Sequence, residues 1–236
     1  MIFKFRVTYK TALILIFLFL NFISYSQLEI GIGTGIPTGE FINDGYAEQG
    51  ISANINYSIS GKFMFASIGY QSGLFLFDND RLTNELEIDF PSSEIFVFTK
   101  PHYYDNIGIG LGFSQKFLNA NFEIKEIITF GYQMAKISEQ NIDVYYYYQH
   151  LELQQSKSTS YNVFGSVGIS ICSNVSKRAY IFCNASYLYS NQTFNCEIYA
   201  KNLTTGYFIT DNNKFNQVFS FVNLSCGLGI RFGKLE

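Results

Sequence analysis

Residues 217–232, QVFSFVNLSCGLGIRF, alternate in character along almost their whole length. The even positions are mainly apolar, and the odd positions include Asn223, Ser225, Gly227, Gly229 and Arg231. Successive side chains of a strand point to opposite faces, so this period predicts a strand with one apolar face and with Arg231 on the other. A tilted strand of about 9 to 11 residues crosses a bilayer. We therefore interpret this stretch as the strand that closes a membrane-spanning β-barrel by pairing with the first strand of the mature chain.

The composition favours strands and excludes a nucleic-acid partner. Of the 236 residues, 47% are hydrophobic, 18% are aromatic and only 15% are charged. Aromatic and β-branched residues favour strands. The net charge of -3 and the lack of any run of Lys and Arg argue against binding to nucleic acid.

The N-terminus has the pattern of an export signal. Three basic residues precede an apolar core at residues 12–20, and Ser24 and Ser26 suit the -3 and -1 positions of a cleavage site. We expect a signal peptide at residues 1–26 and one barrel domain at residues 27–236. The alternative, an uncleaved membrane anchor, would need a longer run of about 20 apolar residues.

Seven more alternating segments precede the closing strand. The eight predicted strands are residues 28–36, 50–59, 63–77, 103–113, 121–135, 161–171, 179–189 and 217–232. The polar face of each carries mostly Gly, Ser and Asn, which are small enough for the narrow interior of an eight-stranded barrel. Glu126 falls on the apolar face, so it lies near an interface or a β-bulge shifts the alternation there.

The connections between these segments alternate between long and short. The long ones are residues 37–49, 78–102, 136–160 and 190–216, and the short ones are residues 60–62, 115–120 and 173–177. Outer-membrane barrels place long loops outside and short turns in the periplasm. We therefore predict an all-β fold, an eight-stranded antiparallel up-and-down transmembrane barrel with long extracellular loops.

A soluble lipid-binding barrel is the structural alternative, because it also alternates apolar and polar residues. The aromatic residues favour the membrane, since many lie near predicted strand ends, where aromatic girdles meet lipid headgroups. These residues are Tyr57, Tyr70, Tyr132, Tyr161, Tyr187, Tyr189 and Phe232.

With these features the chain resembles the small outer-membrane β-barrel proteins of Gram-negative bacteria, the OmpA/OmpX-like "porin family". The resemblance covers roughly residues 27–232 and rests on the export signal, the Gly-rich strands and the closing GLGIRF at residues 227–232. It implies a location in the bacterial outer membrane, contact with outer-membrane lipid, and the barrel-assembly machinery as a partner during biogenesis, with Phe232 as the aromatic assembly signal. Residues 233–236 depart from this pattern, because the chain continues beyond the aromatic residue. The family implies no single activity.

The sequence carries few signs of chemistry. His102 and His150 lie in predicted outer loops, and no metal-binding or phosphate-binding motif accompanies them. We expect no cofactor, no metal and no enzymatic activity. The alternative is a lipid-modifying enzyme with His102 as its base.

The outer loops are the expected working surface. A possible binding site there consists of Tyr145, Tyr146, Tyr147, Tyr148 and His150. Tyrosine offers contact area with a polar group. We favour a second interpretation, in which residues 143–153 extend the barrel strands above the membrane and their tyrosines pack on neighbouring hairpins. We likewise expect residues 196–210 to form a protruding hairpin.

Four charged residues are expected inside the barrel near its periplasmic end. They are Glu29, Glu123, Lys125 and Arg231. Charges in a water-poor interior must be paired, so we predict a polar plug that fills the lumen. The alternative is that Arg231 reaches periplasmic water.

The four cysteines suggest no disulfide framework. The alternation places Cys172 inward, Cys183 and Cys226 outward, and Cys196 in a loop. Cys183 and Cys226 are the only two on one face of neighbouring strands, and they are the one candidate pair.

The sequence as a whole predicts an outer-membrane barrel with a structural or surface-binding role, facing an unidentified extracellular or envelope partner. The alternative is a transport or secretion accessory that docks a partner.

Overall fold

The computed structural model describes residues 25–61, 63–117 and 121–233. The signal peptide expected at residues 1–26 lies outside these ranges except for Tyr25 and Ser26, which begin the first strand. Among the described residues, no helix is long and apolar enough to cross a membrane.

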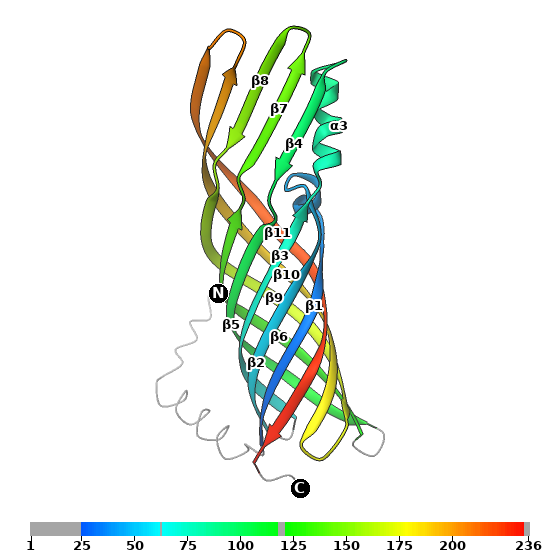
Figure 1. Ribbon diagram of the computed structural model, residues 1–236. Coiled ribbons are helices and arrows are strands. Elements are labelled where there is room, and N and C mark those ends of the chain that lie inside the picture. The colour runs from blue at the N-terminus through cyan, green and yellow to red at the C-terminus, as the bar shows by residue number, and fades with distance from the viewer. Residues whose placement is uncertain (1–24, 62, 118–120, 234–236) are drawn as a thin grey trace, which may run out of the picture.

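Eight antiparallel strands close into a tall barrel (Figure 1). They are β1 (Tyr25–Pro37), β2 (Ala47–Ser60), β3 (Met64–Phe77), β5 (His102–Phe117), β6 (Phe122–Ile137), β9 (Ser158–Asn174), β10 (Ala179–Asn202) and β11 (Phe208–Phe232). Each strand pairs with the next in this order, and β11 returns to β1. The predicted all-β fold class is confirmed.

The closing strand pairs with the predicted strand, and its side chains point to the predicted faces. Leu28 lies opposite Ile230, and Ile32 lies opposite Cys226, with no shift in register from residue 26 to residue 37. Ile32 is 75% exposed on the outside of the barrel, whereas Ser225 and Arg231 face inward and are buried.

The outer face of the barrel requires lipid. Isoleucine, valine, leucine and phenylalanine side chains stand exposed around the wall, whereas the lumen holds serine, asparagine and charged residues. An apolar belt of this kind would be unstable in water, and a closed barrel satisfies all its backbone groups within a bilayer. The soluble alternative requires the reverse arrangement and is wrong. The chain is a transmembrane β-barrel of the bacterial outer membrane.

The expected outer loops are mostly regular structure. They contain α2 (Glu40–Asn43), α3 (Asn79–Asp89), β4 (Glu94–Thr99), β7 (Gln140–Tyr146) and β8 (Gln149–Gln155). The α3 helix begins where the Asp78 side chain accepts a hydrogen bond from the backbone N–H of Arg81, a common helix N-cap. The segments expected as loops at residues 78–102, 136–160 and 190–216 instead fold into strands and a helix above the membrane, and the protruding hairpin expected at residues 196–210 is confirmed.

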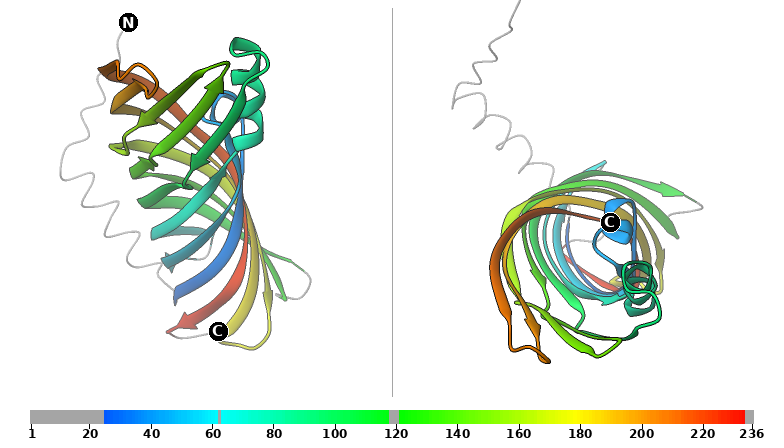
Figure 2. Two further views of the ribbon diagram at one scale, coloured as in Figure 1. Left: turned by 45° about the horizontal axis from the view of Figure 1, so that its top comes forward. Right: turned by 90° about the horizontal axis from the view of Figure 1, so that it is seen from above.

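These added strands form one sheet above the barrel (Figure 2). The strand order is β4–β7–β8–β10–β11, in which β8 joins β10 where Gln155 lies opposite Ile198. We call β4, β7, β8, residues 196–202 of β10 and residues 208–213 of β11 the extracellular sheet. The interpretation that residues 143–153 form strands above the membrane describes this region better than a loop does.

Glu126 lies on the outward face of β6, in regular register with Phe113 and Ile169. No bulge interrupts β6 there, so the bulge interpretation is wrong. A register irregularity occurs instead in β2, between Ala47 and Gly50. Glu126 is exposed four residues from the periplasmic start of its strand, where a carboxylate can reach the interface.

The cysteine side chains lie where the alternation predicted, with one exception. Cys196 lies within β10 and is 2% exposed, so the loop expected there is wrong. Cys172 is buried in the lumen, and Cys183 and Cys226 are exposed on the lipid face. These two lie directly opposite each other on β10 and β11, with their Sγ atoms 2.8 Å apart. All four cysteines are free in this structure.

We predict that the Cys183–Cys226 pair oxidises selectively. A membrane-permeant thiol oxidant applied to the folded barrel should remove two of the four thiols, because little movement would bring these sulfurs to the length of a disulfide bond, about 2.05 Å. Thiol counting after denaturation measures this. Cys226→Ser should retain all of its remaining thiols, and a wild-type protein that loses none would contradict the register of β10 and β11.

Candidate functional site

Two ion pairs cross the lumen near its periplasmic end. Lys125 Nζ lies 2.6 Å from Glu29 Oε1, and Arg231 Nη2 lies 2.9 Å from Glu123 Oε2. The four side chains, which we call the lumen cluster, are between 1% and 8% exposed. Arg231 points into the barrel and does not reach periplasmic water.

The strand order explains why these residues meet. Glu29 and Arg231 lie on β1 and β11, and Glu123 and Lys125 lie on β6, four strands away from β1 around the ring. The inward phase of the three strands therefore directs the carboxylates and cations across the narrow lumen toward each other.

Neutral groups complete the lumen cluster. Tyr180 Oη lies 2.8 Å from Glu29 Oε1, and its ring lies beneath the Arg231 guanidinium, 4.4 Å from Cζ to the ring centroid. Gln27 accepts a hydrogen bond from Lys125, and Ser114 donates one to Glu123. Because every carboxylate oxygen has a donor, the charges are balanced without bulk water.

Tyr180 and Gln27 were missed from the sequence, although a signal for Tyr180 existed. Its position between the outward-facing Ala179 and Ile181 gives it an inward phase. A Cβ atom on Gly229 would lie only 2.1 Å from Tyr180 Cζ, so glycine on the facing strand leaves space for the ring.

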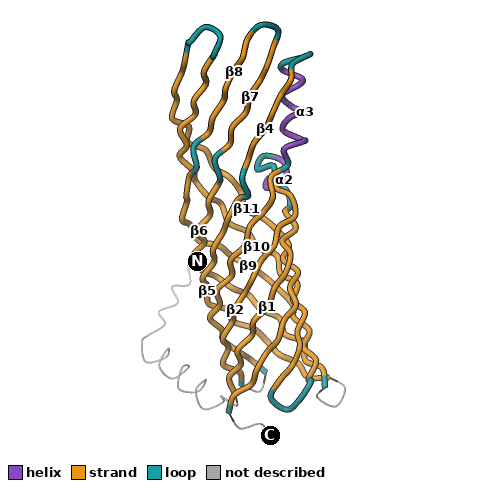
Figure 3. Tube along the Cα trace, viewed as in Figure 1, coloured by secondary structure: helices purple, strands orange, loops and turns teal. Residues whose placement is uncertain are grey.

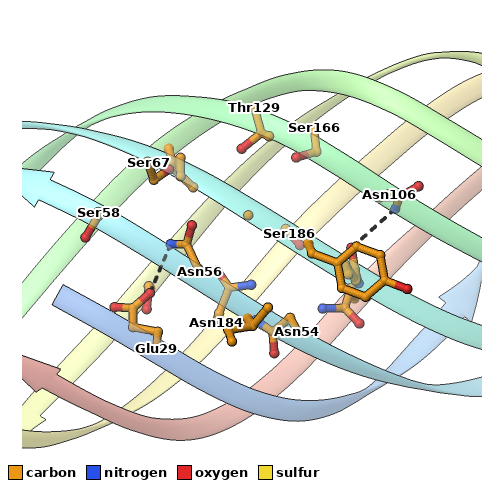
Figure 4. Close-up of a pocket in the computed structure, with 18 of the residues that line it drawn as sticks. Glu29, Asn54, Asn56, Ser58, Ser67, Asn106, Thr129, Ser166, Asn184 and Ser186 are labelled. Atoms are coloured by element: carbon orange, nitrogen blue, oxygen red, sulfur yellow. Dashed lines mark hydrogen bonds between the residues drawn. The ribbon is translucent and has the colours of Figure 1, made fainter.

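A small polar cavity adjoins the lumen cluster, and Glu29 and Lys125 form part of its lining (Figure 4). Its volume is about 130 Å³. Its polar lining includes Asn54, Asn56, Ser67, Asn106, Thr129, Ser166, Asn184 and Ser186. These side chains are neutral, and none of them is a nucleophile paired with a base.

An aromatic layer closes the outer mouth above this cavity. It consists of Phe41, Phe75, Tyr104, Phe164, Phe194, Phe219 and Phe221. The ring centroids of Phe75 and Phe221 are 4.9 Å apart, and those of Phe41 and Phe219 are 4.3 Å apart. Phe41 comes from α2, which lies over the mouth (Figure 3). The lumen is therefore closed by charged groups below and by aromatic rings above.

The predicted surface residues divide into a packed group and an exposed group. Tyr145 stacks on His150 with centroids 4.1 Å apart, and His150 Nε2 lies 3.3 Å from Asp143 Oδ1. Tyr146 contacts the rings of Phe90 and Tyr147 edge to face. Tyr147 and Tyr148 are nevertheless 78% and 94% exposed. His150 lies in β8, whereas a loop was expected there.

His102 lies at the start of β5, so the loop expected there is also wrong. It is 3% exposed, its Nε2 lies 3.3 Å from the Gly45 carbonyl oxygen, and its ring packs against Phe77. A base for lipid chemistry would have to reach its substrate, and this ring is enclosed. Within the described ranges, no group of three or more His, Cys, Asp or Glu residues could hold a metal ion.

Phe232 is the last residue of β11 and lies opposite Ser26 of β1, with 47% of its surface exposed on the outer face. Its expected role as an assembly signal stays a prediction.

No family model and no curated protein sequence matches the chain. Its fold is similar to three solved outer-membrane barrels. The attachment invasion locus protein Ail of Yersinia pestis is 15% identical, with 89% of this chain and 99% of that chain covered and a TM-score of 0.45. The outer membrane protease OmpT of Escherichia coli is 11% identical (89% and 95% covered, TM-score 0.45). A major outer membrane protein of Thermus thermophilus is 9% identical (88% and 99% covered, TM-score 0.46).

We predict that the lumen cluster contributes strongly to stability. Arg231→Ala should lower the free energy of unfolding by about 3 to 5 kcal/mol, because Glu123 is left charged and buried. Reversible urea unfolding in lipid vesicles measures this. Arg81→Ala, which breaks the exposed Arg81–Glu85 pair of α3, is the control and should change little.

Removing both charges separates electrostatics from packing. Glu123→Leu combined with Arg231→Met should recover most of the lost stability, because no buried charge is left unpaired. A double variant as unstable as Arg231→Ala would mean that lost packing, and not an unpaired charge, causes the effect.

Proposed function

We propose that this protein is a closed outer-membrane barrel with a surface-binding role, in which the membrane part anchors and the extracellular sheet makes the contact. The observation that carries this proposal is the turn between β7 and β8. Tyr146 pairs with Gln149, so Tyr147 and Tyr148 alone form a two-residue turn. Both side chains project into the surroundings at the top of the molecule.

The backbone of this turn suits other residues better. Tyr147 has a φ of 52°, in the left-handed region that bulky side chains rarely adopt. Of the two turn residues only Tyr147 has a positive φ, and turns of this kind favour Gly at the first position; strained residues of this sort cluster at functional sites. A tyrosine pair here sacrifices stability and exposes aromatic area, the kind of surface that dominates protein contacts.

Neighbouring groups hold the turn in place. The backbone N–H of Leu203 donates to the His150 carbonyl, 2.8 Å away, and Thr204 Oγ1 donates to the Tyr148 carbonyl, 3.3 Å away. The tips of the β7–β8 and β10–β11 hairpins are therefore tied together. Tyr207 and Phe208, 66% and 68% exposed, bring further aromatic surface to the second tip. A rigid aromatic surface loses little entropy on binding.

The closed lumen distinguishes this proposal from its rivals. A transport barrel needs a continuous path, whereas the lumen cluster and the aromatic layer obstruct this one at two levels. A secretion accessory that docks a partner through its outer surface remains the second candidate function. The lipid-modifying enzyme has less support, because His102 is enclosed.

We predict that replacing Tyr147→Gly and Tyr148→Asn removes binding without weakening the fold. Glycine suits the positive φ of the first turn position, so the variant should be at least as stable as the wild type. Adherence of producing cells to immobilised extracellular proteins and to neighbouring cells should fall.

Val175→Ser is the matched control, since Val175 is 69% exposed in the turn between β9 and β10 at the opposite end of the barrel. The mobility of unboiled protein on gels verifies folding for each variant. Adherence equal to that of the wild type in the Gly-Asn variant would contradict the proposed surface role.

We further predict that the purified barrel conducts no ions in planar bilayers. Ions cannot pass a lumen closed by paired charges and packed rings. Sustained stepwise conductance from the wild-type protein would favour the transport alternative.

A further inference from the structure

The lipid-facing wall has a hollow at Gly165. Among the described glycines within the barrel strands, Gly165 on β9 is the one whose position faces outward, because Val163 and Val167 on either side of it share that face. It lies directly opposite Phe130 on β6 and Tyr189 on β10. Large side chains therefore surround a position that has none.

This hollow belongs to an apolar groove of about 800 Å³. The outward-facing side chains that line it include Ile107, Ile109, Phe130, Tyr132, Val163 and Tyr189. Phe130 and Tyr132 are 67% and 68% exposed, so their rings stand out from the wall as sides of the groove. The volume lies in the range of pockets that bind small ligands.

The pairing of β9 with β10 explains the depth of the groove. The backbone ladder between these strands ends where Phe164 lies opposite Ser190. Above that point, Ser158 and Ser160 Oγ accept hydrogen bonds from the backbone N–H groups of Asn195 and Thr193, at 3.2 and 3.1 Å. Serine side chains therefore separate the two backbones here. We call this contact between residues 158–160 of β9 and residues 193–195 of β10 the serine junction, and the groove lies directly below it.

A cation lies above the groove on the same face. Lys136 follows Tyr132 by four residues on β6, about 13 Å along the strand, or about 10 Å along the membrane normal at the usual strand tilt, which is within the depth of one leaflet. Its Nζ lies 5.9 Å from the ring centroid of Tyr103. The nearby Asp105 accepts a hydrogen bond from Tyr70 of β3, so its carboxylate is turned away from β6.

We propose that this groove binds an acyl chain of an anionic outer-membrane lipid, with the lipid phosphate against Lys136. The groove is continuous with the lipid-facing belt, so lipid is the molecule that covers it. The distance from Lys136 to the groove suits a lipid whose phosphate is at the interface and whose chain descends between Phe130 and Tyr189. The site does not depend on the proposed surface role.

A single tryptophan provides a direct test, because the chain contains none. Val167→Trp places the reporter next to Gly165 without changing the groove lining. In phosphatidylcholine vesicles, phosphatidylglycerol with brominated chains should quench this tryptophan about three to five times more effectively than brominated phosphatidylcholine at equal mole fraction, given one lysine at an anionic headgroup. Lys136→Gln should abolish the preference.

A second experiment fills the groove with a larger side chain. A Cβ atom at Gly165 would lie 3.5 Å from Phe130 Cε1, an ordinary contact, so Gly165→Val should fold and should reduce quenching by both lipids. Ala53→Val, on the lipid face of β2, is the matched control and should change nothing. A reporter at Ile32→Trp should show no preference between the lipids. Equal quenching by both lipids at position 167, or no effect of Gly165→Val, would overturn the proposal.

Discussion

The closure of β11 onto β1 is the constraint on which the rest of the molecule depends. A bilayer offers no hydrogen-bond partners to a free strand edge, so a membrane-spanning sheet has to end where it began. Twelve successive residue pairs, from Ser26–Phe232 to Pro37–Phe221, make this closure. Once the ring is closed, the alternation of each strand separates a lipid-facing wall from a lumen, and polar residues gather where lipid cannot reach them.

The side chains that fill the lumen must also be stabilised by partners, and the kind of partner differs between the two ends of the barrel. Near the periplasm, charged groups are isolated from water and are stabilised by partners on the far side of the barrel, as Arg231 is by Glu123. Near the outer mouth, rings pack on one another and on Phe41 of α2. The interior thus changes from an electrostatic core to an aromatic core along one axis, with a small polar cavity between them.

Local alternation was sufficient to predict the wall of the barrel and the residues of its lumen cluster. It places Glu29 and Arg231 inward from their own strands, and the ring of eight strands brings them to β6. It was not sufficient for the aromatic layer, since Phe219 and Phe221 continue the inward phase of the closing strand with side chains typical of the outer face. The extracellular sheet was also missed in part. β4 is a strand because it pairs with β7, which is distant in sequence. The six residues of β4 do not by themselves indicate that partner. Asp78 was a local sign of α3, but the charged residues after it are equally typical of a loop.

The serine junction marks the point where the attachment of β9 to β10 changes along the barrel axis. Below Phe164 and Ser190, each strand depends on a continuous backbone ladder, and a change that shifts one strand is felt around the whole ring. Above them, Ser158 and Ser160 attach β9 to β10 through hydroxyl groups, and the extracellular sheet extends from the β10–β11 hairpin through β8. The β10–β11 ladder, in contrast, runs unbroken from Ala179 and Ile230 in the membrane to Lys201 and Phe208 above it. A change in the upper hairpins therefore reaches the membrane ring mainly through β10 and β11 and least through the hydroxyl contacts between β9 and β10.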